Sequence, residues 1–485
     1  FVEPLEVLAA PTDQGNVNTT PFPINYDPNE GLVHYGFYGD MDDIGMRVEN
    51  DLNNANIEQK DIVVFPDDLV GLKDENGADM FPGYDPSNAY YDYTDMLNQA
   101  LEIARAKGNL RVHVNPGVYY FEGSIPLHGY TPIDGEAGKT AFVVKPNFID
   151  RYGQECGEYG FFTIDNVKER YSWYFSSVSD LTIVVEGTHP SFKPTSTYEE
   201  IYANILSDDI QATDKYSLFY HIRIGYGGIY NNAAAGFSSY FRSSFVDMLT
   251  KVQNNTFGPC RDVIYGCDTN DAMFANNIFY GGYFTDEEGL QRMPTFMTTF
   301  NTGTTTFTNS YISNFHLART GAGCWAPHAS YSNVTFERVL NICVDTTAKA
   351  NIAMSGCHLL NCTRTDVERY FESFGYEEHD PHWENGKWTT DGNGYMIFQS
   401  LTKYNKRNNY EKEQEAHMFR AGSMSISQCL IECDSLENTI LFHMDDSEWE
   451  SKYTNERKAS KCLTFTDNAF KIRDWKYENL LKIDW

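Results

Sequence analysis

Three aspartates stand close together in the stretch "GPCRDVIYGCDTNDAMFANN", residues 258–277. Asp262 and Asp268 are six residues apart, so they share one face if the segment stays extended, and Asp271 follows the next turn. Hydrolysis of a glycosidic bond needs two carboxyl groups, one as acid and the other as base or nucleophile. The spacing therefore predicts a catalytic role for Asp262, Asp268 and Asp271. Polar Asx turns are the structural alternative for Asp268 and Asp271.

A second stretch, "NFHLARTGAGCWAPHASY", brings together groups that suit sugar binding. The Trp325 ring could stack on a sugar face, and His316, Arg319 and His328 could bond hydroxyl groups or stabilise a developing charge. Lone histidines are more often structural, but four such groups within 13 residues favour a substrate-binding segment.

Two further stretches add weaker candidates for substrate binding. Glu287 lies in the acidic stretch "YFTDEEGLQR", where a solvated loop is the alternative to a functional one. Arg242, with Tyr230 and Tyr240, lies in the aromatic stretch "GGIYNNAAAGFSSYFRSSF".

A repeat surrounds these candidates and must position them. Stretches such as "FANNIFYGG", "YSNVTFERV" and "FTDNAFKIR" each combine an Asn-type or small turn residue with a following apolar residue. Successive apolar marks at Phe257, Phe279, Ile312, Phe336 and Leu359 are 22, 33, 24 and 23 residues apart. Steps of this size suit a coil of three short parallel strands per turn, in which turn asparagines form a ladder along the stack.

A helix is expected before the repeats, over residues 94–107. Leu97, Ala100, Leu101 and Ala104 fall on one helical face, Asp92 or Thr94 can cap its start, and Gly108 can close it. A stack of strands has an open end with exposed apolar side chains, so we expect this helix to cap the coil.

The pattern "DYTDMLNQAL…LRVHVNPGVYYFEGSIPL…YTPIDGEAGKTAFVV" resembles the right-handed parallel β-helix proteins of the pectate-lyase-like superfamily. The resemblance implies an all-β, right-handed parallel β-helix solenoid with an N-terminal cap helix and an inserted loop region. The layout is similar to that of the lacto-N-biosidases and inulin fructotransferases, although no catalytic motif of either family is matched residue by residue. The superfamily holds lyases, glycoside hydrolases, epimerases and phage tailspikes, so it implies work on glycans without fixing the reaction.

The expected organisation has four parts. Residues 1–90 form an N-terminal extension packed on the body, and residues 91–365 form the β-helix with its cap. Residues 366–420 form a charged, aperiodic insertion, and residues 421–485 form the last rungs and a C-terminal cap.

The amino-acid composition limits the classes of binding partner that we expect. With 37 basic and 68 acidic residues, the net charge of −31 disfavours nucleic acid and anionic lipid and favours a neutral glycan. No stretch approaches the roughly 20 apolar residues of a membrane span. The ten cysteines form no CxxC pair and are expected to be mostly buried free thiols. A homo-oligomer is compatible with these features, and a glycan substrate implies a secreted or cell-surface location.

The leading hypothesis is a glycoside hydrolase, or a related glycosyl-transferring enzyme, that cleaves a neutral glycan and requires no cofactor. The first alternative is a polysaccharide lyase acting on uronates, with Arg261, Arg319, His316 or Lys349 as base or neutralising group and with calcium as a compatible ion. The second is a non-catalytic glycan-binding β-helix.

Overall fold

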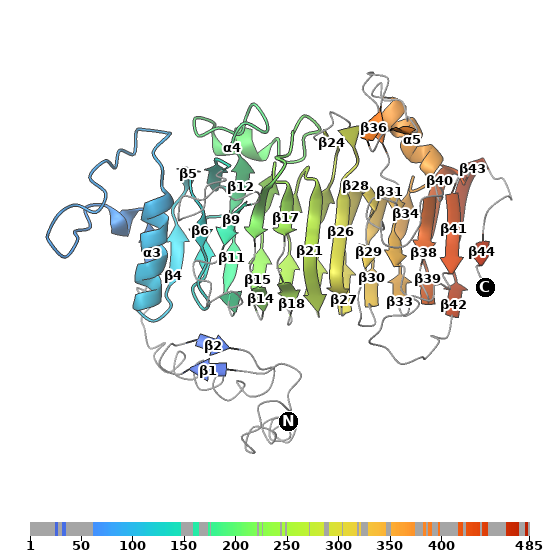
Figure 1. Cartoon of the computed structure of the whole chain (residues 1–485), viewed down its shortest axis with the longest axis horizontal. Helices are drawn as coiled ribbons and strands as arrows, with labels where there is room; N and C mark the ends of the chain where they lie inside the picture. Colours follow the sequence, from blue (N-terminus) through green and yellow to red (C-terminus); the bar gives the residue numbers. More distant parts are fainter. Residues whose placement is uncertain are drawn as a thin grey trace, which may run out of the picture.

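The computed structural model describes residues 25–27, 32–34, 62–146, 159–163, 173–174, 176–220, 223–225, 227–242, 245–247, 250–270, 272–285, 291–302, 304–317, 320–321, 328–345, 351–373, 382–384, 387–389, 396–397, 416–420, 423–436, 439–444, 462–474 and 481–483. The chain forms a long right-handed coil of parallel strands, which confirms the predicted fold (Figure 1). Its strands line three faces that run the length of the coil.

The first face is a 12-stranded parallel sheet. In spatial order its strands are β3 (Ile62–Phe65), β4 (Arg111–Val114), β7 (Ile133–Asp134), β11 (Ser177–Ser179), β15 (Gly228–Tyr230), β19 (Lys251–Gln253), β22 (Ala272–Ala275), β27 (Thr304–Thr308), β30 (His328–Ser332), β33 (Asn351–Ser355), β39 (Ser423–Ser427) and β42 (Cys462–Thr466).

The other two faces belong to one bent 25-stranded sheet. The second face contains β5 (Gly117–Phe121), β8 (Thr140–Val144), β12 (Thr182–Val185), β16 (Ala233–Ala235), β20 (Thr256–Phe257), β23 (Ile278–Tyr280), β28 (Tyr311–Leu317), β31 (Thr335–Asn341), β34 (His358–Leu360), β40 (Leu430–Ser435) and β43 (Ala469–Asp474). The third contains β6 (Ile125–Pro126), β9 (Tyr159–Thr163), β10 (Trp173–Tyr174), β13 (Tyr216–Tyr220), β14 (Arg223–Gly225), β17 (Ser239–Arg242), β18 (Phe245–Asp247), β21 (Asp262–Asn270), β26 (Thr295–Thr302), β29 (Thr320–Gly321), β32 (Cys343–Asp345), β38 (Ala416–Arg420), β41 (Thr439–Met444) and β44 (Leu481–Ile483).

The apolar marks read from the sequence are stacked in direct register. Phe257 pairs with Phe279, Phe279 with Ile312, Ile312 with Phe336, and Phe336 with Leu359. All five are buried in one core. The extra residues of the 33-residue step lie outside the strands of the coil and include the small strands β24 (Phe284–Thr285) and β25 (Gln291–Arg292), so the stack is unbroken.

The turn from the first to the second face has a constant form. From β11 onward each strand of the first face is separated by two residues from its successor on the second. The first of the two adopts a left-handed conformation, with φ of 57° at Asn231, 59° at Asn254 and 56° at Asn276. Asparagine tolerates this conformation better than most residues. The first turn residue after β30, Asn333, has a similar φ of 54°.

The second turn residue forms the predicted asparagine ladder inside the coil. Asn255 is 1% exposed, and its amide oxygen accepts the Asn232 N–H at 2.9 Å. Its Nδ2 donates to the Ile229 carbonyl at 2.9 Å and to the Asn277 amide oxygen at 3.0 Å. Each rung thereby satisfies the buried polar groups of the next.

Helix α3 (Thr94–Ala106) covers one end of the coil, as predicted, and contacts β3, β4 and β6. Leu97, Ala100, Leu101 and Ala104 are fully buried against the core. Because β3 pairs with β4, the coil already includes residues 62–65, which lie within the expected N-terminal extension.

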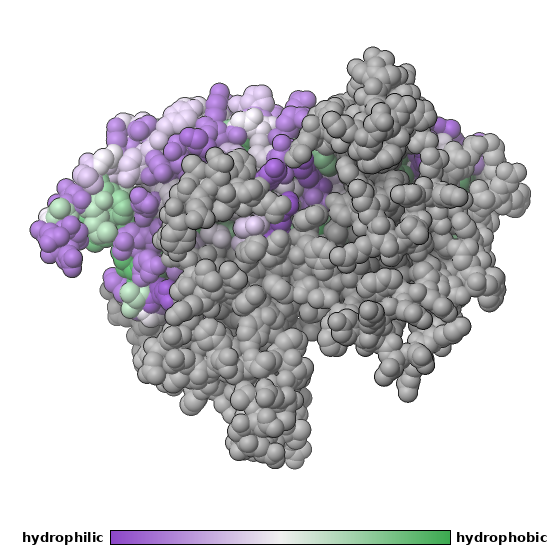
Figure 2. Space-filling model, in the orientation of Figure 1, coloured by the Kyte–Doolittle hydropathy of each residue, from purple (hydrophilic) through white to green (hydrophobic). Residues whose placement is uncertain are grey.

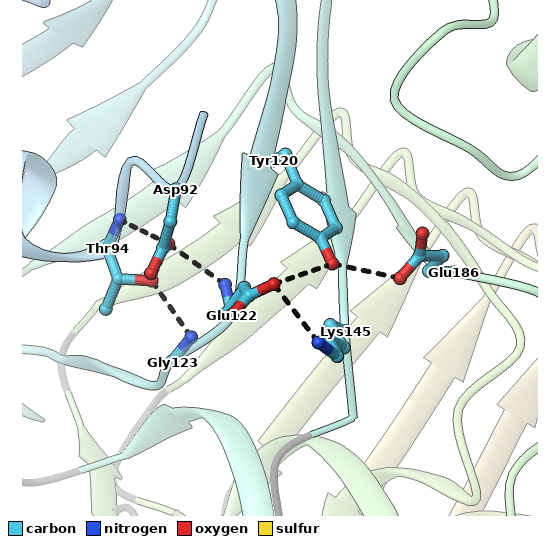
Figure 3. A network of polar contacts seen from close by, with 7 residues as sticks. All are labelled: Asp92, Thr94, Tyr120, Glu122, Gly123, Lys145 and Glu186. Atoms are coloured by element: carbon cyan, nitrogen blue, oxygen red, sulfur yellow. Dashed lines mark hydrogen bonds and ion pairs between the residues drawn. The ribbon is translucent and has the colours of Figure 1, made fainter. Parts of the chain in front are cut away.

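Figure 3 shows how the helix start is fixed to the first rungs. The Asp92 carboxylate accepts the Thr94 and Glu122 N–H groups, each at 3.0 Å. The Thr94 hydroxyl accepts the Gly123 N–H at 2.9 Å. Asp92 and Thr94 therefore join the start of the helix to the end of β5.

Three insertions with described elements leave the coil at the corner between the second and third faces. Helix α4 (Tyr198–Tyr202) lies between β12 and β13, strands β24 (Phe284–Thr285) and β25 (Gln291–Arg292) lie between β23 and β26, and α5 (Arg364–Glu372) follows β34. Figure 1 shows α4, β24 and α5 along the same upper edge. Figure 2 shows that hydrophilic residues cover this edge above α4.

The remaining elements are small. They are η2 (Asp67–Leu69), the antiparallel pair β1 (Asn25–Asp27) and β2 (Leu32–His34), β37 (Met396–Ile397), which pairs with β25, and the antiparallel pair β35 (His382–Glu384) and β36 (Lys387–Thr389). Thus β35, β36 and β37 lie within the expected insertion 366–420, α5 begins two residues before it, and its last five residues form β38 of the coil. Within the described residues no helix is long and apolar enough to cross a membrane.

The cysteines in the described core are free, as expected. Cys260, Cys357, Cys362, Cys429 and Cys433 are buried free thiols, and Cys462 is an exposed one.

Candidate functional site

Asp262 begins β21 on the third face and lies on the outside of the coil. It pairs with Ser239 on one side and Thr295 on the other. The next position in the register holds Phe296, whose ring lies 4.8 Å from Phe279 and 5.6 Å from Phe307, inside the coil. Because strand side chains alternate, Asp262 and Thr295 lie on the opposite side of their strands from Phe296, where Thr295 is covered to 4% exposure and Asp262 is half-buried.

Burial and two cations decide the protonation of Asp262. The side chain is half-buried, and this burial raises its pKa from 3.8 to about 7, while Arg242 and Arg261 act in the opposite direction. A carboxyl group with a pKa near neutrality can donate a proton to a leaving group at physiological pH.

Arg261 is held in place beside this carboxyl group. Its guanidinium forms an ion pair with Asp214 and lies 4.8 Å from the centre of the Phe284 ring. The Arg261 side chain is 14% exposed, whereas Asp214 is 55% exposed. Asp214 comes from the end of the α4 insertion and Phe284 from β24, so two insertions meet the third face here.

A second polar cluster lies at the same corner, where sequence reasoning missed it. The Tyr280 hydroxyl donates to Asp208, which follows α4, and also interacts with Tyr370 of α5. The Arg338 guanidinium lies 4.1 Å from the centre of the Tyr370 ring. Burial, followed by the Asp208 interaction, raises the pKa of Tyr280. Tyr280 thus connects the α4 insertion to α5.

The cluster continues along the second face. Glu337 accepts hydrogen bonds from the Tyr311 hydroxyl and from Arg338, and the Arg338 Nε donates to Asn314 at 2.7 Å. Burial, with Glu337 as the next cause, raises the pKa of Tyr311 to about 12. Tyr280 and Glu337 each follow an apolar mark by one residue and share a register row. Aligning the residues after the marks would have revealed this cluster.

The register of β21 affects the predicted aspartate trio. Asp262 pairs with β17, whereas Asp268 pairs with Phe245 of β18, and the pairing of β21 with β26 has two register shifts between Tyr265 and Thr269. The spacing argument assumed an uninterrupted extended segment, so the convergence of Asp262 and Asp268 stays a prediction. Asp271 lies outside the described residues.

The predicted binding residues are distributed over several places. Arg242 ends β17 and influences Asp262 electrostatically. His316 is in β28, where the structure describes the strand only, and His328 begins β30 on the first face. Tyr240 is fully buried and its hydroxyl bonds the Gly258 carbonyl at 2.8 Å, so the prediction of a sugar contact by Tyr240 is wrong. The remaining predicted binding residues, Glu287, Arg319 and Trp325, lie outside the described residues.

Another carboxylate pair occurs near the cap but has a structural explanation. The Tyr120 hydroxyl lies 3.2 Å from Glu122 and 3.1 Å from Glu186, and Lys145 lies 3.1 Å from Glu122 (Figure 3). Glu122, Lys145 and Glu186 follow β5, β8 and β12 on successive rungs. The alternating charges form a ladder that ties these rungs together.

Metal binding finds no support in the described part of the chain. No group of three or more His, Cys, Asp or Glu side chains there is arranged to hold a metal ion. The predicted compatibility with calcium is therefore untested.

No protein-family model matches the chain. No curated protein matches it. Three similar solved structures illustrate the likeness that does exist. The GH87 α-1,3-glucanase from Streptomyces thermodiastaticus has 9% identity and a TM-score of 0.38 over 87% of this chain and 70% of its own. DFA-IIIase from Arthrobacter chlorophenolicus A6 has 9% identity and a TM-score of 0.36 over 82% and 98%.

The tailspike of Acinetobacter phage vB_ApiP_P1 has 12% identity and a TM-score of 0.36 over 60% of this chain, which spans 56% of the tailspike. Such likeness concerns the path of the chain and says nothing about the chemistry of the corner site.

Proposed function

We propose that this protein is a carbohydrate-active enzyme, a glycoside hydrolase or related glycosyl-transferring enzyme, that acts on a neutral glycan at the corner between the second and third faces. The observation that carries the proposal is Asp262, a half-buried carboxyl group whose pKa is raised to about 7. Asp262 would protonate the leaving oxygen. Asp268 or Asp271 would activate water or attack as nucleophile.

A neutral substrate fits the charges of this corner. Arg261 is paired with Asp214, and the chain as a whole carries a charge of −31. Polyanionic chains would meet repulsion over most of the surface. Arg242, Glu287, His316, Arg319 and Trp325 remain the proposed glycan-binding residues of this corner, whereas His328, which begins β30 on the first face, remains a proposed glycan contact outside it. A secreted or cell-surface location would give access to such glycans.

The test compares Asp262→Asn, Asp268→Asn and Asp271→Asn with the wild type in a reducing-end assay on neutral and uronate glycans. Loss of general acid catalysis should lower kcat on a neutral glycan by at least about 100-fold in Asp262→Asn. Asp474→Asn, at the exposed end of β43, is the matched control and should keep full activity. Unchanged turnover in all three variants would reject this site.

A lyase remains the second candidate because Arg242 and Arg261 both lie near Asp262 and could neutralise a uronate. A lyase forms an unsaturated product that absorbs in the ultraviolet, whereas a hydrolase does not. Ultraviolet-absorbing products from a uronate glycan, without new reducing ends from neutral glycans, would assign the lyase reaction.

A further inference from the structure

The outer side of the first face becomes an uncharged array of small polar groups over its last five strands, β27, β30, β33, β39 and β42. Side chains alternate along each strand, so the buried Phe307, Tyr331, Met354 and Ile426 point inward and their neighbours point outward. We call the outward set the hydroxyl face. Its members are Thr306, Thr308, His328, Ser330, Ser332, Asn351, Ala353, Ser355, Ser423, Ser425, Ser427, Cys462, Thr464 and Thr466.

The absence of charge from these fourteen positions is unusual for this chain. Charged residues make up 22% of the sequence, so about three would be expected among fourteen residues. Ten of the fourteen are Ser or Thr, and none is Asp, Glu, Lys or Arg. All of them are exposed or half-buried.

The hydroxyl face is also regular. The four strand pairings that build it match all five residues of each strand with no register shift. Thr306, Ser330, Ala353, Ser425 and Thr464 form one row across the strands, and a parallel row begins two residues later. Strands lie about 4.8 Å apart and alternate residues about 6.6 Å apart, so the outward groups form a flat two-dimensional lattice.

Several hydroxyl groups of this face have no hydrogen-bond partner among the described residues. Within the described part of the chain, the hydroxyls of Thr306, Ser330, Ser332 and Ser425 make no side-chain hydrogen bond. Each can donate one hydrogen bond and accept others. The face therefore offers a periodic set of donors and acceptors to whatever lies against it.

The residue types on the hydroxyl face favour some classes of binding partner over others. The lack of basic residues disfavours nucleic acid, and the lack of large apolar residues disfavours a bilayer. Interfaces between proteins are enriched in aromatic residues and depleted in Ser, and a second copy would bring another −31 charges. A neutral, hydroxyl-rich and periodic surface fits best.

We propose that the hydroxyl face docks the protein on the ordered surface of an insoluble neutral polysaccharide. Each hydroxyl contact is weak, but many contacts repeated at a fixed spacing bind together as a multivalent set. The face lies on different strands from Asp262, so docking would leave the corner site free to work. Binding is independent of turnover and is measured without it.

The probes are particles of microcrystalline cellulose, chitin and linear mannan, with calcium pectate gel as the charged control. Wild-type protein should be depleted from solution by at least one neutral material and not by pectate gel. Depletion by none of the three neutral materials would overturn the proposal. Retention on ice crystals alone would also overturn it, because it would assign the lattice to ordered water.

The variant Ser330→Glu/Ser425→Glu places two carboxylates inside the lattice, where an uncharged surface offers them no partner. Its apparent Kd for the bound material should rise by about tenfold or more. Gln253→Glu, on β19 of the same sheet but outside the hydroxyl face, is the matched control and should bind as the wild type does. Thermal unfolding checks the folding of each variant.

Thr464→Glu, at an exposed position of the last strand, gives a second test if the double variant does not fold. Undiminished binding of the folded Glu variants would overturn the proposal, as would a wild-type dimer in analytical ultracentrifugation that these variants dissociate. Asp262→Asn should bind undiminished, so an error in the proposed reaction would not be mistaken for an error about this face.

Discussion

Replacing Asp262 with asparagine should stabilise the folded protein at alkaline pH while abolishing its proposed activity. Burial raises the pKa of Asp262 from 3.8 to about 7, so the folded state holds its proton more tightly than the unfolded state does. Stability then falls with rising pH, because the native state binds more protons over this range. The favourable contribution of the protonated form is complete below pH 3.8 and is lost as the pH rises through about 7.

The size of the effect follows from the pKa difference. A rise from 3.8 to about 7 corresponds to roughly 4 kcal/mol at 1.36 kcal/mol per unit. At pH 5 only about 1.5 kcal/mol of this cost has developed, by the same conversion. The attraction of Arg242 and Arg261 is already contained in the value of about 7. Asparagine has nearly the same shape and carries no charge, so it escapes the cost at every pH.

Urea unfolding of the wild type and Asp262→Asn at pH 5 and pH 8 measures this difference. The stability advantage of the variant should increase by about 2–3 kcal/mol between the two pH values. Asp474→Asn, at an exposed position, should change stability by less than about 0.5 kcal/mol at both. An advantage that stays constant or shrinks as pH rises would refute the assignment of a raised pKa to Asp262, and with it the acid role.

Three further predictions concern the scaffold. Asn255→Ala breaks the buried ladder and leaves buried groups unpaired, so it should lower the free energy of unfolding in urea by about 2–4 kcal/mol. Asn254→Gly, on the exposed turn, should lower it by under about 1 kcal/mol. Equal losses would remove the ladder's role. Leu101→Ala leaves a cavity beneath the cap helix and should lower the free energy of unfolding by about 2–5 kcal/mol in the same assay. A negligible decrease would mean that the helix does not close the core. Tyr280→Phe removes the hydrogen-bond donor to Asp208, so it should speed amide hydrogen exchange around α4 and lower the free energy of unfolding by about 1 kcal/mol. Unchanged exchange would contradict the link between α4 and α5.

The coil was predictable because its signal is repeated. Phe257, Phe279 and Ile312 were identified as equivalent from composition and spacing alone, and the sheet places them in direct register. The cap helix was predictable from its single apolar face, because that face is buried as a unit. Both features rest on local sequence patterns that tertiary contacts reinforce.

The site was harder to predict because its residues come from segments of irregular length. Asp208, Tyr280 and Tyr370 meet at one hydroxyl group although they are far apart in sequence. The six-residue spacing of Asp262 and Asp268 predicts that they share one strand face. That prediction assumes regular alternation, and spacing alone does not reveal the register shifts inside β21. Sequence patterns identify the rungs, whereas the contacts between insertions depend on which corner each insertion leaves.

The asparagine turns explain why these insertions lie at the corner between the second and third faces. The turn from the first to the second face needs a left-handed residue followed by one that continues the buried column, and it has the same two-residue length from β11 to β43. A longer turn would break the ladder at Asn232, Asn255 and Asn277 and leave buried amides unpaired. Among the described residues the next corner carries no such ladder, and the chain between the second and third faces varies from one residue after β31 to a whole insertion after β34. The described insertions therefore gather at that corner, where Asp214 and Phe284 contact Arg261 beside Asp262, while the residues of the hydroxyl face stay exposed or half-buried.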